Sequence, residues 1–146
     1  MTENTVFVVA VNESEGAGRA ASFAAREARL HGATLLLLHV IEWSQYEFMP
    51  VRELESTHSR KKKAIETAQT RIIDPLTRSA SDHDVRVEAR IDLGDTNETV
   101  VTVMQEVAAT RVYVGRHAGS HVLERFVGSL PSYLVRHATV PVTIVP

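Results

Sequence analysis

The sequence predicts an α/β fold in which helices cover a parallel β-sheet. Five short runs rich in apolar and β-branched residues alternate with segments whose apolar residues recur at helical spacing. Parallel strands need such long crossover connections, which are right-handed when they contain helices. The 146 residues include no cysteine and are 44% hydrophobic and 23% charged, which is typical of one globular domain. We therefore expect residues 1–146 to form a single domain.

The five runs predict two kinds of strand. Thr5–Val11, Thr34–Val40 and Arg111–Gly115 are almost continuously apolar, as expected for strands that helices cover on both faces. In Val85–Ile91, apolar residues alternate with charged ones, which predicts one exposed face and a place at the edge of the sheet. The last predicted strand, Val140–Val145, is apolar and would leave an exposed edge unless a partner covers it.

Four segments between the strands are predicted to be helices: Gly18–His31, Arg52–Ala80, Asp95–Ala109 and Ser129–His137. Gly32 follows the first segment, where a glycine commonly ends a helix. Pro75 has no backbone N–H, so we expect it to kink or interrupt the second helix. The three lysines of the chain, Lys61–Lys63, also lie in this segment, and they predict a solvated helical face rather than a binding patch.

Charge and composition narrow the classes of function. A net charge of −2 offers no concentrated positive face for nucleic acid, which favours a small ligand or a protein partner. The lack of cysteine excludes disulfides, thiolate metal sites and cysteine nucleophiles. The first apolar stretch, Val6–Val11, is too short for a signal peptide or a membrane span. We therefore expect a soluble, cytoplasmic protein that does not associate with a membrane.

Two loops at the carboxyl ends of predicted strands combine glycine with hydroxyl residues: Asn12–Gly16 after the first strand, and Arg116–Ser120, which leads on to Gly128 and Ser129, after the fourth. In open α/β sheets the ligand crevice lies at such ends, where the strand order reverses. Gly115 and Gly128 would let the backbone approach a phosphate, and the helix that starts at Ser129 would add free N–H groups. Arg116 and His117 would add side-chain contacts. The same glycines also suit simple turns, and Ser129 suits a helix cap, so an anion site and a structural loop remain equal alternatives.

This segment resembles the universal stress protein family. The family pattern is a glycine, two residues, a second glycine, nine residues, and then glycine followed by serine or threonine. This chain keeps that spacing, with the four positions held by Gly115, Ala118, Gly128 and Ser129. The opening strand with its loop, the second strand, and the glycine before the third helix also agree with the family. The resemblance covers essentially the whole chain.

The resemblance implies a Rossmann-like fold of the adenine nucleotide alpha hydrolase type, with five parallel strands in the order 3-2-1-4-5. It also implies an adenine nucleotide, ATP or else AMP or ADP, with or without magnesium, between the first and fourth strands. The residues assigned to the nucleoside are Ala10, Val11, Asn12 and Val40. The residues assigned to ribose and phosphates are Val114, Gly115, Arg116, His117, Ala118, Gly119, Gly128, Ser129 and Leu130. No catalytic residue and no protein metal ligand is assigned.

Two positions depart from the family pattern. The family usually has aspartate where this chain has Asn12, and an amide lacks the acceptor-only character of a carboxylate. Ala118 replaces the second glycine, and its methyl group would hinder a close phosphate approach unless Gly119 absorbs the strain. Three functions stay open: a nucleotide-binding regulator, a dimeric interaction module with an empty pocket, and a weak ATPase. We favour the regulator and do not expect an enzyme.

Members of the family often form a homodimer through the last strand, here residues 140–145, and we expect the same here together with a protein partner that the sequence does not identify. The loop Ile41–Val51 carries four large side chains: Trp43, Tyr46, Phe48 and Met49. They predict a small cluster packed under the long helix, with a lid or a partner-facing patch as the alternative.

The histidines of the chain give no metal-site prediction. His117 and His121 lie four residues apart, but in a glycine-containing loop whose nearby carboxylate is Glu124 alone. His39 follows an apolar run, so we expect it to be structural and to cap the end of a strand.

Overall fold

The computed structural model describes residues 4–43, 51–117 and 129–146, and within residues 51–56 only the backbone. Five parallel strands form one sheet in the order β3-β2-β1-β4-β5, as predicted. The strands are β1 (Val6–Ala10), β2 (Thr34–Glu42), β3 (Val87–Gly94), β4 (Arg111–Gly115) and β5 (Val142–Val145). The central strands β1 and β4 are buried along most of their length, because helices cover both faces.

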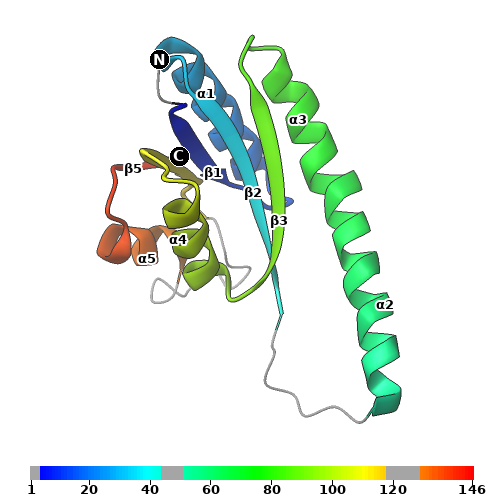
Figure 1. The fold of residues 1–146 in the computed structure, drawn as a ribbon. Coiled ribbons are helices and arrows are strands. Elements are labelled where there is room, and N and C mark those ends of the chain that lie inside the picture. Colours follow the sequence, from blue (N-terminus) through cyan, green and yellow to red (C-terminus); the bar gives the residue numbers. More distant parts are fainter. Residues whose placement is uncertain (1–3, 44–50, 118–128) are drawn as a thin grey trace.

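The helices divide between the two faces of the sheet (Figure 1). One face carries α1 (Glu15–His31), α2 (Val51–Ala68), a π-helical segment η1 (Gln69–Ile73) and α3 (Asp74–Ser81). The other face carries α4 (Thr96–Glu106) and α5 (Leu130–His137). Each face buries its own apolar cluster, so the sheet separates two layers of core. In the described ranges, no helix combines the length and the apolar character that crossing a membrane requires.

Side-chain caps set where three of the helices begin. Ser14, Asp95 and Ser129 each accept a hydrogen bond from the backbone N–H three residues later, at 3.2, 2.9 and 3.4 Å. Because Ser14 is the cap, α1 begins three residues before the predicted Gly18. Gly32 ends α1 as predicted, since its φ of 64° turns the chain so that the N–H of Ala33 donates to the carbonyl of Ala28 at 2.8 Å.

Pro75 interrupts the long second helix, as predicted. The segment just before it, η1, is π-helical, and the N–H of Asp74 donates to the carbonyl of Gln69, five residues earlier. A proline at this position has no N–H to donate, and in a regular α-helix its ring would meet the carbonyl of Arg71. The wider π turn accommodates the proline ring. α2 begins beyond the end of β2 and runs back beside the sheet, and η1 joins it to α3 (Figure 1).

The two edge strands differ most from the predicted ranges. β3 lies at one edge, as its alternation predicted, but it runs from Val87 to Gly94 because its partner β2 continues to Glu42, which pairs with Gly94. On β3, Arg90 forms ion pairs of 2.7 Å with Asp92 and with Glu106 of α4. β5 lies at the opposite edge and starts two residues later than predicted.

Candidate functional site

The carboxyl ends of β1 and β4 lie side by side at the reversal of strand order. β1 pairs with β2 on one side and with β4 on the other, and Ala10 is opposite Val114. The chain leaves β1 through α1 on one face, whereas α4 and α5, which flank β4, lie on the other face. Such a reversal leaves room between the two loops that follow the strands. This is where the sequence predicted a ligand crevice.

Four of the predicted site residues form an apolar floor on one face of the sheet. Ala10, Val40, Val114 and Leu130 all belong to the cluster under α4 and α5, and each is at most 7% exposed. Val114 is completely covered, so it supports the floor from beneath and is not itself open to a ligand. Val11 belongs to the cluster on the opposite face, and its side chain is not part of this floor.

Gly115 has little room for a side chain, for a reason that involves neither turn geometry nor phosphate. A Cβ atom at this position would lie 3.1 Å from the carbonyl oxygen of Gly16 and 3.2 Å from its carbon. Both atoms are backbone, so no side-chain rotation relieves the contact. The end of β4 therefore rests directly on the first turn of α1, which brings the helix start to the ligand crevice. The backbone N–H of Arg116 then donates to the carbonyl of Val145 at 2.9 Å, and the side chains of Arg116 and His117 are exposed.

Asn12 keeps the acceptor function that the family's aspartate would supply. Its Oδ1 accepts hydrogen bonds from the backbone N–H of Ser14 at 3.0 Å and from the Ser14 hydroxyl at 2.5 Å. Ser14 in turn caps α1 through the N–H of Ala17. A carboxylate would accept the same two bonds, so what this chain lacks at this position is a negative charge. The amide nitrogen of Asn12 adds two donors that aspartate does not have.

The remaining phosphate-side residues divide between described and undescribed segments. Ser129 is the N-cap of α5 and accepts from the N–H of Ser132, so it has the capping role that was one of its two predicted alternatives; phosphate binding stays a prediction. Ala118, Gly119 and Gly128 lie outside the described residues, as do His121 and Glu124. Within the ranges that are described, histidines and carboxylates form no group of three that would hold a metal ion.

His39 has the structural role that the sequence predicted. Its Nδ1 donates a hydrogen bond of 2.7 Å to the carbonyl of Val11, which ties β2 to the loop after β1. The prediction that His39 caps the strand end is wrong, because β2 continues to Glu42 along its partner β3. Because side chains alternate along a strand, His39 and Ile41 face α2, whereas Val40 faces α4. Of the four large side chains in the loop after β2, the structure describes Trp43, whose ring lies about 5.5 Å from the charged groups of Arg60 and Lys61 on α2. Tyr46, Phe48 and Met49 fall outside the described residues.

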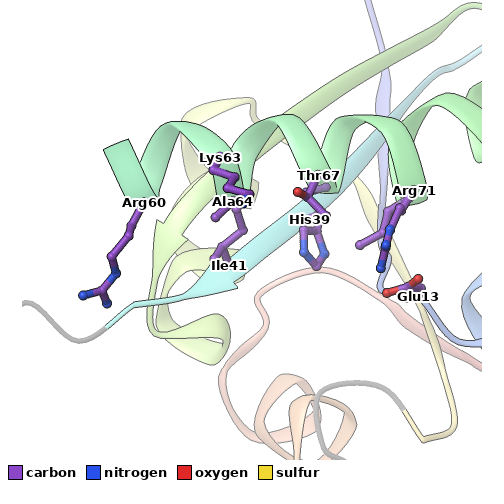
Figure 2. Close-up of a pocket in the computed structure, with 10 residues that line it drawn as sticks. Glu13, His39, Ile41, Arg60, Lys63, Ala64, Thr67 and Arg71 are labelled. Atoms are coloured by element: carbon purple, nitrogen blue, oxygen red, sulfur yellow. The ribbon is translucent and has the colours of Figure 1, made fainter. Parts of the chain in front are cut away.

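The sequence did not predict a cavity of about 430 Å³ between β2, α2 and η1 (Figure 2). Its lining includes Glu13, His39, Ile41, Arg60, Lys63 and Arg71. The signal that could have found it is the strand alternation, which sends His39 and Ile41 to the face opposite Val40. The run of three lysines was predicted to form a solvated helical face, and Lys62 is indeed exposed. Its neighbour Lys63, however, lines the cavity.

Comparison with known proteins shows that nearly the whole chain is similar to one family. The model of the universal stress protein family matches residues 4–146. A universal stress protein of Mycolicibacterium smegmatis is 29% identical over 143 residues, which are 94% of this chain and 47% of that protein. The chain therefore spans about half the length of this relative.

Two solved structures share the fold at full length. One is a universal stress protein in complex with cAMP, with a TM-score of 0.69, 20% identity, and coverage of 99% of this chain and 98% of that chain. The other is the universal stress protein from Archaeoglobus fulgidus in complex with dAMP, with a TM-score of 0.68, 21% identity and complete coverage of both chains. These structures show the shared fold, and the match of the family model over residues 4–146 shows that the chain belongs to the universal stress protein family.

Proposed function

We propose that this protein binds an adenine nucleotide at the carboxyl ends of β1 and β4. It then acts as a regulatory protein, because a partner protein distinguishes its nucleotide-bound state from its nucleotide-free state. The observation that carries the proposal is the close packing of Gly115 on the first turn of α1, which sets a helix start beside the end of β4. Relatives of the same fold support the choice of ligand, since one was solved with cAMP and another with dAMP.

In this proposal the apolar floor receives the base and the two loops receive the polar groups. Ala10 and Val40 lie at the ends of neighbouring strands, where an adenine ring would cover apolar surface. The amide nitrogen of Asn12 donates to a base or ribose acceptor, because its oxygen already binds Ser14. For the phosphates, the start of α5 at Ser129 supplies backbone N–H groups. Arg116 and His117 supply their exposed side chains.

The proposed role is binding without turnover. The residues assigned to the site include no carboxylate and one imidazole, that of His117, whose side chain is exposed. No general base of evident geometry is therefore aimed at a γ-phosphate. A weak ATPase that depends on a divalent cation held by the phosphates is the rival enzyme function. Release of ADP that stops when Gly128 is replaced by valine would favour the ATPase.

We also propose that the protein forms a homodimer through β5. This strand pairs with β4 on one side only, and Ile144 is 41% exposed at the open edge. Open edge strands pair readily with a second copy. Ile144→Lys is expected to convert the dimer to a monomer in light scattering, whereas Val135→Lys, an exposed apolar position on α5, is expected to leave the mass unchanged.

The experiment that tests nucleotide binding is a calorimetric titration of the purified protein with ATP and with AMP, each with and without magnesium. We expect binding of one nucleotide per chain. Ala118→Gly, which restores the family glycine, is expected to tighten binding, and Gly128→Val is expected to abolish it. If wild-type protein and Ala118→Gly both fail to bind any adenine nucleotide, the protein is the interaction module instead.

A further inference from the structure

The cavity beside α2 combines an apolar wall with a positively charged rim. Ile41, Ala64 and Ile72 contribute apolar surface, while Arg60, Lys63 and Arg71 contribute three positive charges against the single carboxylate of Glu13. The chain as a whole carries a net charge of −2, so this positive excess is local. A cavity of about 430 Å³ lies within the range of small-molecule sites, roughly 300–1,000 Å³.

The cations on this rim are not neutralised by neighbouring carboxylates. Among the side chains that the structure describes, none of the three forms an ion pair. Arg60 lies over the ring of Trp43, with 5.6 Å between the guanidinium carbon and the ring centroid, which fixes its position at one end of the cavity. Arg71 extends from η1 toward Glu13 at the other end (Figure 2). Positive charge distributed along the cavity in this way favours an anionic ligand over a cationic one.

His39 adds a polar group to the cavity. Its Nδ1 is held by the carbonyl of Val11, which fixes the plane of the ring. Among the described residues none hydrogen-bonds to its Nε2, and the ring lies opposite Thr67 of α2, one turn from Lys63 (Figure 2). Arg71 belongs to the π-helical segment η1, and such turns occur often at functional sites. Three elements, β2, α2 and η1, therefore contribute polar groups to one cavity.

We propose that this cavity is a second ligand site, which binds a small organic anion: an acidic head group held by Lys63, Arg71 and His39, carried on an apolar body that lies against Ile41 and Ile72. The site is separate from the nucleotide site. His39 and Ile41 face α2, on the side of the sheet opposite the floor formed by Ala10 and Val40.

The test uses the full chain and the fluorescent probe anilinonaphthalene sulfonate, an aromatic anion. The probe is titrated into wild-type protein with and without saturating ATP. We expect saturable binding that ATP does not displace. Lys63→Gln and Arg71→Gln are each expected to weaken the affinity for the probe about three- to fivefold, a modest effect because solvent screens exposed charges. Lys62→Gln is the matched control, because its side chain is adjacent, exposed and outside the lining.

A second measurement locates the probe independently of any variant. We expect the imidazole nitrogen resonance of His39 to shift on addition of the probe, and Ala64→Leu, which fills part of the cavity, to remove both the shift and the fluorescence. The proposal is overturned if ATP displaces the probe completely, if Lys62→Gln weakens binding as much as Lys63→Gln, or if the resonance of His39 does not move. The last two outcomes do not depend on whether the nucleotide site binds ATP, so they distinguish failure of this proposal from failure of the proposed function.

Discussion

Replacement of Gly115 by alanine tests whether close packing of β4 on α1 forms the site. The added Cβ would stand 3.1 Å from the carbonyl oxygen of Gly16 and 3.2 Å from its carbon, closer than ordinary van der Waals contact. Because both atoms belong to the backbone, either β4 or the first turn of α1 has to shift. Overpacking of this kind costs about 1–3 kcal/mol. We expect a loss of that size in the free energy of unfolding, together with weaker nucleotide binding.

The matched control is Gly18→Ala in the same helix. A Cβ at Gly18 meets no atom within 4 Å, and the position is helical. Alanine is therefore expected to stabilise the protein by about 0.5–1 kcal/mol, because it restricts the unfolded chain more than glycine does. Urea unfolding followed by circular dichroism measures both variants. A Gly115→Ala protein as stable as wild type, with unchanged nucleotide affinity, would refute the packing argument.

Three further predictions concern stability, and urea unfolding checks each of them. Gly32→Ala forces a side chain into the left-handed backbone at φ 64° and is expected to cost about 1 kcal/mol, whereas an unchanged midpoint would show that this end of α1 relaxes. Ser14→Ala removes the cap of α1 and is expected to cost about 1 kcal/mol, more than Ser59→Ala on the exposed face of α2. Burial raises the pKa of Tyr113, so its ionisation in the unfolded chain is expected to lower the free energy of unfolding above about pH 10. Tyr113→Phe is expected to remove that loss. Wild type and Tyr113→Phe that lose stability in parallel as the pH rises would contradict this prediction.

The sign of the Tyr113 effect follows from which state releases the proton first. The phenol is completely buried and, among the described residues, its hydroxyl has no hydrogen-bond partner of good geometry, although Arg111 lies close enough to lower the pKa slightly. Desolvation is the larger effect, so the folded-state pKa lies above the unfolded one. The stabilising contribution is complete below the unfolded pKa and is lost as the pH rises through the folded one.

The sequence predicted the sheet well because its signals are local and strong. Continuous apolar runs located β1, β2 and β4, and the alternation of charged and apolar residues placed β3 at an edge. The same signals could not predict where β3 begins and ends, because its length depends on how far β2 continues as its partner. The start of α1 moved to Glu15 because Ser14, itself held by Asn12, caps the helix.

The candidate site was predicted in part for a similar reason. Spacing identified Gly115, but only the packing on Gly16 shows why a side chain does not fit there. The retained acceptor function of Asn12 depends on a bond to Ser14 that no residue pattern reveals. The second cavity depends on how α2 and η1 pass over β2, which is a tertiary arrangement. Periodicity assigned Lys63 to the helix surface and carried no information about what that surface faces.

The most direct test of the central claim is to identify what the protein carries. Protein purified without added nucleotide is denatured, and the supernatant is analysed by mass spectrometry, with a titration of ATP and magnesium on a second sample. We predict an adenine nucleotide near one equivalent per chain, or stoichiometric uptake of the added ATP by empty protein. Protein that carries no nucleotide and takes up none would contradict nucleotide binding and identify the chain as an interaction module.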